Sequence, residues 1–135
     1  MTKHKVVRKR LEIAKRRLKV SESLLGDGFY NESLSGSYYA IFAATKSLLA
    51  SRDLDAKRHS GVIALFNKHF IKTEQLPKEL SKTIAKARTA QESSDYEDFY
   101  EATKEEADNQ LQKAILFVQE VEKFLEELGY ETKEG

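Results

Sequence analysis

Hydrophobic side chains in residues 34–49 recur at the spacing of an amphipathic α-helix. They share one side of a helix that turns every ~3.6 residues: Leu34, Tyr38, Ile41, Phe42, Leu48 and Leu49. The opposite side carries small residues: Ser37, Ala40, Ala43, Ala44 and Ser47. Small side chains let a second helix pack at about 8–10 Å between the two axes. We therefore expect this helix to be buried on two sides, at the centre of a helical bundle.

The same periodicity and a few capping residues divide the whole chain into helices. The predicted helices span residues 1–27, 31–51, 59–71, 77–92 and 103–128. Asn31 is expected to cap the central helix, and Pro77 to begin the fourth, where a missing N–H costs nothing. Thr103 and Glu106 have the spacing of a capping box at the start of the last helix. The prediction is a single all-α domain, residues 1–135, folded as an up-down bundle of four to five helices.

The composition narrows the chemistry that the chain can perform. The 135 residues include no cysteine, so neither a disulfide framework nor a thiolate metal site can form. The three histidines lie too far apart in the sequence to act as paired ligands, and we expect no metal and no cofactor. The N-terminus lacks the apolar region of a signal peptide, and no run approaches the ~18 apolar residues of a membrane span. We expect a soluble, cytoplasmic protein without membrane contact.

The formal net charge of +1 hides a strong separation of charge along the chain. Residues 1–20 carry a net charge of +8, whereas residues 92–135 carry −10. If the first and last helices pack side by side, most of this charge is expected to cancel in surface ion pairs. Alternatively, cations of the first helix line a groove for a polyanion: Lys5, Arg8, Lys9, Arg16 and Arg17.

A series of motifs in the chain resembles a known family. In order they are YYAIFAATKSLL, RHSGVIALFNKHFIKT, LPKEL, AKAR followed by SDY, and EEA before the final helix. Over nearly the whole chain they resemble the small stand-alone prokaryotic HEPN domains. The resemblance implies a homodimer that works with a minimal nucleotidyltransferase in a toxin-antitoxin or RNA-directed defence role. It further implies that RNA or a nucleotide binds in a cleft between two subunits, where an arginine from each subunit converges.

Active members of that family are metal-independent endoribonucleases with a signature of an Arg, four to six residues, and a His. Arg88 stands at the position of the signature arginine, but the histidine window holds Asp95, followed by Tyr96. An imidazole, with a free pKa near ~6.5, suits proton transfer at neutral pH, whereas an aspartate titrates near ~3.9. The resemblance thus implies that Arg88 holds a phosphate, while the missing histidine argues against cleavage.

Two alternatives stay open from the residues alone. The chain could be an endoribonuclease that uses Arg88 with Asp95 or with His59, an imidazole that a second subunit could bring near Arg88. It could instead be a non-catalytic interaction module that touches no nucleic acid. Arg88 also has a purely structural interpretation, a bond to Asp95 or Glu92 that closes the end of its helix.

Aromatic residues supply the remaining candidates for binding RNA or a nucleotide. Tyr96 is predicted to lie in a polar loop beside Asp95, where an aromatic ring could stack on a base. Tyr39 is the second aromatic candidate, although aromatic residues at helical spacing more often pack in a core. His59 has a structural interpretation as well, as a helix cap or as the partner of a tyrosine hydroxyl.

Overall fold

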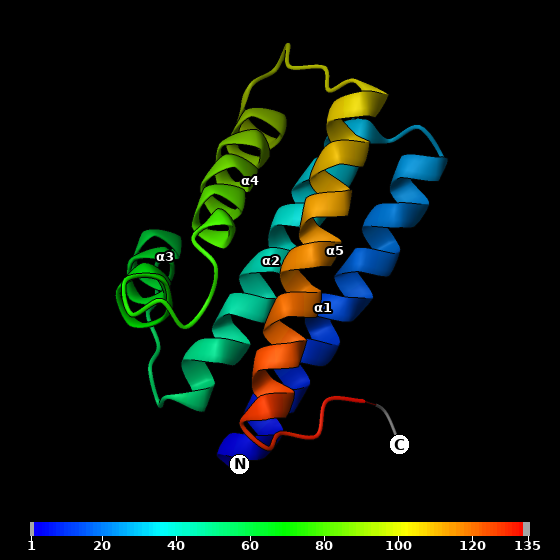
Figure 1. The fold of residues 1–135 in the computed structure, drawn as a ribbon. Coiled ribbons are helices and arrows are strands. Elements are labelled where there is room, and N and C mark those ends of the chain that lie inside the picture. Colours follow the sequence, from blue (N-terminus) through cyan, green and yellow to red (C-terminus); the bar gives the residue numbers. More distant parts are fainter. Residues whose placement is uncertain (1, 134–135) are drawn as a thin grey trace.

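The computed structural model describes residues 2–133 and arranges them as a bundle of α-helices (Figure 1). The α-helices are α1 (Lys3–Gly26), α2 (Tyr30–Ser51), α3 (His59–Phe66), α4 (Glu79–Tyr96) and α5 (Lys104–Glu127). The end of α3 continues into one turn of π-helix, η1 (Asn67–Ile71). Residues 2–133 contain no β-strand, so the all-α prediction is confirmed.

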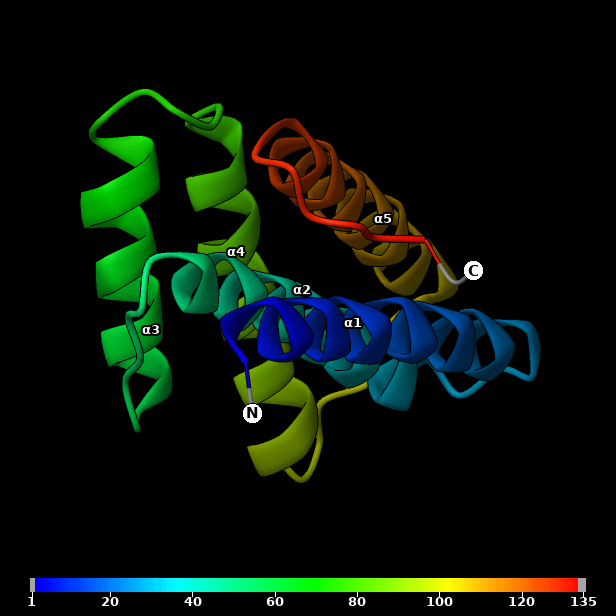
Figure 2. The ribbon, with the colours of Figure 1, turned by 90° about the horizontal axis from the view of Figure 1, so that it is seen from below.

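The centre of the bundle is α2, which contacts each of the other four α-helices. Figure 1 shows α1 antiparallel to α2, with α5 in front of this pair and with α3 and α4 to its left. The view from below separates the same groups, with α3 and α4 apart from α5 (Figure 2). Tyr38, Ile41 and Leu48 of α2 are fully buried, as are Ala40 and Ala44. The expectation that this helix is buried on two sides is therefore confirmed.

Buried serines form one part of the contact between α1 and α2. The Ser21 hydroxyl donates to the Ser33 carbonyl at 2.7 Å and lies 2.9 Å from the Ser37 hydroxyl, while the Ser33 hydroxyl donates back to the Ser21 carbonyl at 2.9 Å. Gly36 packs so tightly here that an added Cβ would lie 3.3 Å from Cβ of Ser21. Small polar residues thus satisfy one another's hydrogen bonds and let the two helices approach closely.

Replacing Ser21 by leucine should destabilise the protein strongly. The larger side chain would overpack the contact with Gly36 and remove the hydroxyl that bonds the Ser33 carbonyl and the Ser37 hydroxyl, so we expect a loss of about 2–5 kcal/mol in the free energy of unfolding. Urea denaturation followed by circular dichroism measures this loss. Ser23→Leu is the matched control, because Ser23 is exposed on the same helix. Equal losses in the two variants would contradict the importance of the serine contact.

The ends of some elements differ from the predicted ones. The fourth helix begins at Glu79 rather than Pro77, which lies in the preceding turn, and it continues through Tyr96 instead of ending at residue 92. Asn31 lies inside α2 and does not cap it. Its side chain instead donates to the Tyr100 carbonyl and accepts from the Ala102 N–H, both at 2.8 Å, and so ties the α4–α5 loop to α2.

The predicted capping box at the start of α5 is confirmed. The Thr103 hydroxyl accepts from the Glu106 N–H at 3.0 Å, while the Glu106 carboxylate accepts from the Thr103 N–H at 3.4 Å. These two bonds satisfy backbone donors that the first turn of a helix leaves without partners.

No helix within residues 2–133 has the length and apolar character that crossing a membrane requires.

The cations of α1 divide into a paired and an unpaired group. Arg8 contacts Glu131 at 3.8 Å and Lys15 contacts Glu122, so the first helix does pair with the last helix and the tail behind it. Other cations of α1 are exposed and have no carboxylate within ion-pair distance in the described part of the chain: Lys5, Lys9, Arg16, Arg17 and Lys19. The pairing interpretation therefore holds for Arg8 and Lys15, and polyanion binding by the exposed cations stays a prediction.

Candidate functional site

Arg88 and His59 are in direct contact within one chain. Arg88 lies on α4 and His59 is the first residue of α3. Nη1 of Arg88 lies 2.7 Å from Nδ1 of His59. From the sequence, His59 was expected to come near Arg88 only in a dimer. In the structure the two side chains meet within one chain, because α3 and α4 both pack against α2.

The contact with Arg88 fixes the protonation pattern of His59. A guanidinium carries only donors, so Nδ1 must accept and the ring proton of the neutral imidazole lies on Nε2. Burial and the positive charge of Arg88 both lower the pKa of His59 below its ordinary 6.5. The ring also stacks on Phe42, with 4.2 Å between centroids. His59 is therefore a neutral, oriented imidazole at pH 7.

The floor of this site is Tyr38, whose side chain is fully buried on α2. Its hydroxyl lies 2.8 Å from Nδ1 of His59, and the guanidinium carbon of Arg88 lies 5.6 Å from the centre of its ring. Burial raises the pKa of Tyr38 to about 12, so the phenol keeps its proton and donates it toward the imidazole. The interpretation of His59 as the partner of a tyrosine hydroxyl is confirmed by this contact.

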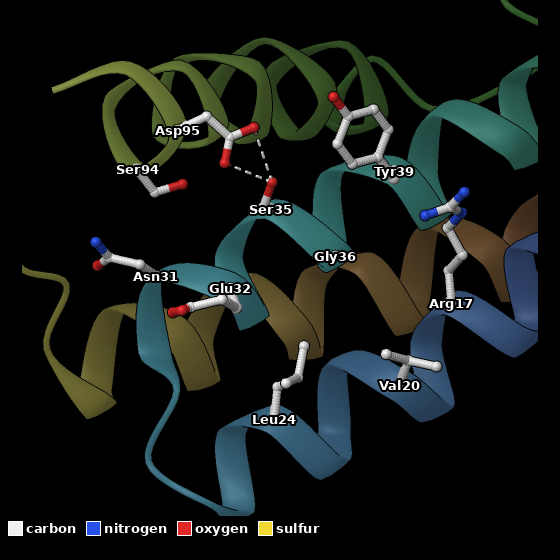
Figure 3. A pocket seen from close by; sticks show the side chains of 10 residues that line it. All are labelled: Arg17, Val20, Leu24, Asn31, Glu32, Ser35, Gly36, Tyr39, Ser94 and Asp95. Carbon is white, nitrogen blue, oxygen red and sulfur yellow. Dashed lines mark hydrogen bonds between the residues drawn. The ribbon is translucent and has the colours of Figure 1, made fainter.

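Gln91 is a buried site residue that the sequence did not single out. Its Oε1 accepts from Arg88 at 3.2 Å, and its Nε2 donates to Asp95 at 2.7 Å. Asp95 in turn accepts from the hydroxyl of Ser35 at 2.9 and 3.1 Å, as the dashed lines in Figure 3 show. Residues 88, 91 and 95 are spaced by three and four, which places them on one face of a helix. The spacing would have pointed to Gln91 if Asp95 had been predicted to lie on the same helix. The predicted helix ended at residue 92 and so left Asp95 out.

Asp95 and Tyr96 lie in the last turn of α4, so the prediction of a polar loop at these residues was wrong. Asp95 is bonded to Gln91 and Ser35, and no direct bond joins it to Arg88. Tyr96 is 76% exposed. Of the two carboxylates proposed as structural partners of Arg88, Glu92 is the one in contact, with its Oε1 3.2 Å from Nε of Arg88.

Tyr39, the second aromatic candidate, borders the same site. Its ring meets the edge of His59 at 6.1 Å between centroids and has the guanidinium carbon of Arg17 5.5 Å from its own centre. Tyr39 is half-buried and lines a surface groove.

The arrangement combines a partly exposed cation and a partly exposed neutral imidazole with a buried phenol. The Arg88 side chain is 32% exposed and presents a planar fork of donors, which suits a phosphate or a carboxylate. The neutral imidazole of His59 suits proton transfer near neutral pH. Among residues 2–133, no three histidine, cysteine, aspartate or glutamate side chains gather closely enough to hold a metal ion. The chemistry available from these side chains is therefore anion binding and acid-base catalysis.

Comparison with known proteins agrees with the resemblance in the motifs. The HEPN domain family matches residues 7–126. Two relatives carry the name "Putative toxin", MJ0142 and MJ0605, both from Methanocaldococcus jannaschii. The first is 38% identical over 117 residues, which cover 87% of this chain and 80% of the relative. The second is 30% identical over 118 residues, 87% of each chain.

A third relative, a UPF0332 protein from Thermotoga maritima, is 32% identical over 105 residues, which cover 78% of this chain and 80% of the relative. The family match extends from α1 into α5 and so includes every side chain of the Arg88 site. The chain therefore belongs to the HEPN domain family.

Proposed function

We propose that this protein acts on RNA as the toxin-like component of a toxin-antitoxin pair, through the site formed by Arg88 and His59. One observation carries the proposal, the 2.7 Å contact between the Arg88 guanidinium and the His59 imidazole. It supplies, from another helix, the imidazole that is missing from the usual position after Arg88. The geometry favours His59 over Asp95 as the proton-transfer group, because Asp95 is held by Ser35 and Gln91 instead.

The chemistry that these two side chains support is transesterification of RNA. The 2′-oxygen attacks the adjacent phosphorus, a P–O2′ bond forms and the P–O5′ bond breaks, which leaves a cyclic phosphate and a 5′-hydroxyl. Arg88 turns toward the phosphate and stabilises its developing negative charge. The Nδ1 lone pair of His59 is freed when Arg88 moves and the Tyr38 hydroxyl rotates its proton away. It then accepts the 2′-hydroxyl proton, and a proton returns to the 5′-oxygen when it leaves.

The printed names of two relatives support the toxin-like role. The proposed antitoxin is a minimal nucleotidyltransferase, and the proposed assembly state is a homodimer that brings two Arg88 sites to one RNA-binding cleft. Co-expression of the protein with a nucleotidyltransferase encoded beside it, followed by affinity purification, tests the partner. Sedimentation of the purified protein tests the dimer. Failure to co-purify would refute the pairing, and a monomer at micromolar concentration would refute the shared cleft.

The RNA proposal is tested with the purified protein and a mixed pool of cellular RNA in the presence of a metal chelator. We expect cleavage products with 2′,3′-cyclic phosphate and 5′-hydroxyl ends. They are detected by direct 5′-labelling with a polynucleotide kinase and by resistance to an exonuclease that requires a 5′-phosphate. Intact RNA that nevertheless binds with a steep dependence on salt would limit the function to RNA binding. Neither cleavage nor binding would overturn the proposal and favour an interaction module.

A further inference from the structure

A groove of about 580 Å³ runs beside the Arg88 site, between α1 and α4, with α2 as its floor (Figure 3). Arg17 and Val20 stand on the α1 wall, Ser35 and Tyr39 on the α2 floor, and Asp95 on the α4 wall. The groove is therefore a mixed polar and aromatic surface rather than a purely apolar one.

Arg17 and Tyr39 form a pair at one end of this groove. The guanidinium carbon of Arg17 lies 5.5 Å from the centre of the Tyr39 ring. Arg17 is exposed, and within residues 2–133 no carboxylate lies in ion-pair distance of it. The ring of Tyr39 also meets the edge of His59, so the pair is continuous with the Arg88 site.

Charge is distributed unevenly along the groove. A second hollow of about 300 Å³ shares Arg17, Val20 and Gly36 with the groove and adds Arg16, so that positive charge gathers on α1. The carboxylates of Glu32 and Asp95 lie toward the other end, and that of Asp95 is already bonded to Ser35. An anionic ligand would therefore bind at the Arg17 end and avoid the acidic end.

The chemistry at the Arg17 end fits one unit of a single nucleic-acid strand, a phosphate next to a flat base. Guanidinium groups bind phosphate oxygens through paired N–H donors, and aromatic rings stack on bases of any sequence. A second copy of this chain fits less well, because a helix laid in the groove would bury the Arg17 charge against few apolar side chains. These are Val20, Leu24 and the Tyr39 ring.

We propose that Arg17 and Tyr39 form a subsite for single-stranded RNA, in which Tyr39 stacks on a base and Arg17 binds the neighbouring phosphate. This subsite rests on the proposed function, since it places the strand beside Arg88 and His59. Its position outside that pair makes it a binding element that holds the RNA while the reaction occurs elsewhere. Removing it should weaken binding without removing the groups that transfer protons.

The test measures binding of a fluorescent 2′-O-methyl RNA oligonucleotide, which has no 2′-hydroxyl and stays intact, by fluorescence anisotropy at several salt concentrations. Arg17→Ala should lower the slope of log K against log salt by about 0.7, the contribution of one phosphate contact on a single strand. Tyr39→Leu should weaken binding about fivefold or more, and Tyr39→Phe should restore it because the ring is kept. Lys113→Ala, which removes an exposed cation on α5 that lines neither hollow, should leave the slope unchanged.

The outcomes separate the subsite from the proposed function. Unchanged binding in Arg17→Ala and Tyr39→Leu, with RNA cleavage intact, would overturn the subsite and leave the function standing. Weakened binding of the intact probe by these variants would support the subsite even if the wild-type protein cleaved no RNA. A wild-type protein that binds no probe would overturn it. A change of sedimentation in Arg17→Ala with unchanged RNA affinity would also overturn it, and would identify the groove as a contact between copies.

Discussion

Replacing Arg88 by alanine should lower the rate of RNA cleavage by a factor of about 100 or more, the effect of removing a charged donor from a developing oxyanion. Arg88→Lys should restore only part of the rate, because an ammonium keeps the charge but lacks the planar fork that binds two oxygens at once. The rate is measured on a labelled RNA under single-turnover conditions, so that product release does not mask the chemical step.

Lys82→Ala is the matched control for this experiment. Lys82 is an exposed cation on the same helix, and its loss changes the net charge by the same amount as the loss of Arg88. A similar fall in rate for both variants would mean that Arg88 acts only through general electrostatic attraction. We expect both variants to fold, because Arg88 is partly exposed and its ion pair with Glu92 lies at the surface. Circular dichroism of each variant checks that unfolding is not the cause of a lower rate.

His59→Gln should lower the cleavage rate by about 10²–10⁴, the usual contribution of general acid-base catalysis. Asp95→Asn should have a much smaller effect, because Asp95 acts on Arg88 only through Gln91. The wild-type rate should fall as the pH drops below 6.5 and protonates the imidazole, with the midpoint below 6.5 because burial and Arg88 lower the pKa of His59. The reverse ranking, with Asp95→Asn the more damaging variant, would assign proton transfer to the carboxylate.

The pKa of His59 can also be checked without RNA. In the unfolded chain the imidazole binds its proton near pH 6.5, whereas in the folded protein it does so only at lower pH. The contribution of His59 to stability is therefore complete above pH 6.5 and is lost as the pH falls toward the lower, folded value. Thermal unfolding at a series of pH values should show a smaller loss of stability in His59→Gln than in the wild-type protein. Equal losses would contradict the lowered pKa.

The helices could be predicted from the sequence because local patterns determine them. The period of apolar residues in α2 and the Thr103 capping box both depend on residues close together in the sequence, and both predictions were right. The end of α4 could not be predicted in the same way. Ser93, Ser94 and Asp95 favour the end of a helix by local preference, but the bonds of Asp95 to Gln91 and to Ser35 on another helix sustain the last turn.

The candidate site depends on contacts that no local pattern contains. Arg88 was found because its position in the chain matches a signature, whereas its contact with His59 joins residues 29 apart that meet only through the packing of α3 and α4 on α2. The fully buried ring of Tyr38 holds the imidazole through its hydroxyl. The position of that ring depends on the packing of the whole core, which no local pattern gives. A homodimer remains a prediction from the resemblance.

The short contact between Arg88 and His59 has a consequence for the idle protein. The guanidinium that would receive a phosphate covers the lone pair that would receive a proton, so one side chain blocks the other while the site is empty. The site would thus become reactive only when a polyanion draws Arg88 away from His59. Under the proposed toxin-like role, such self-restraint would limit cleavage between encounters with RNA, independently of any antitoxin.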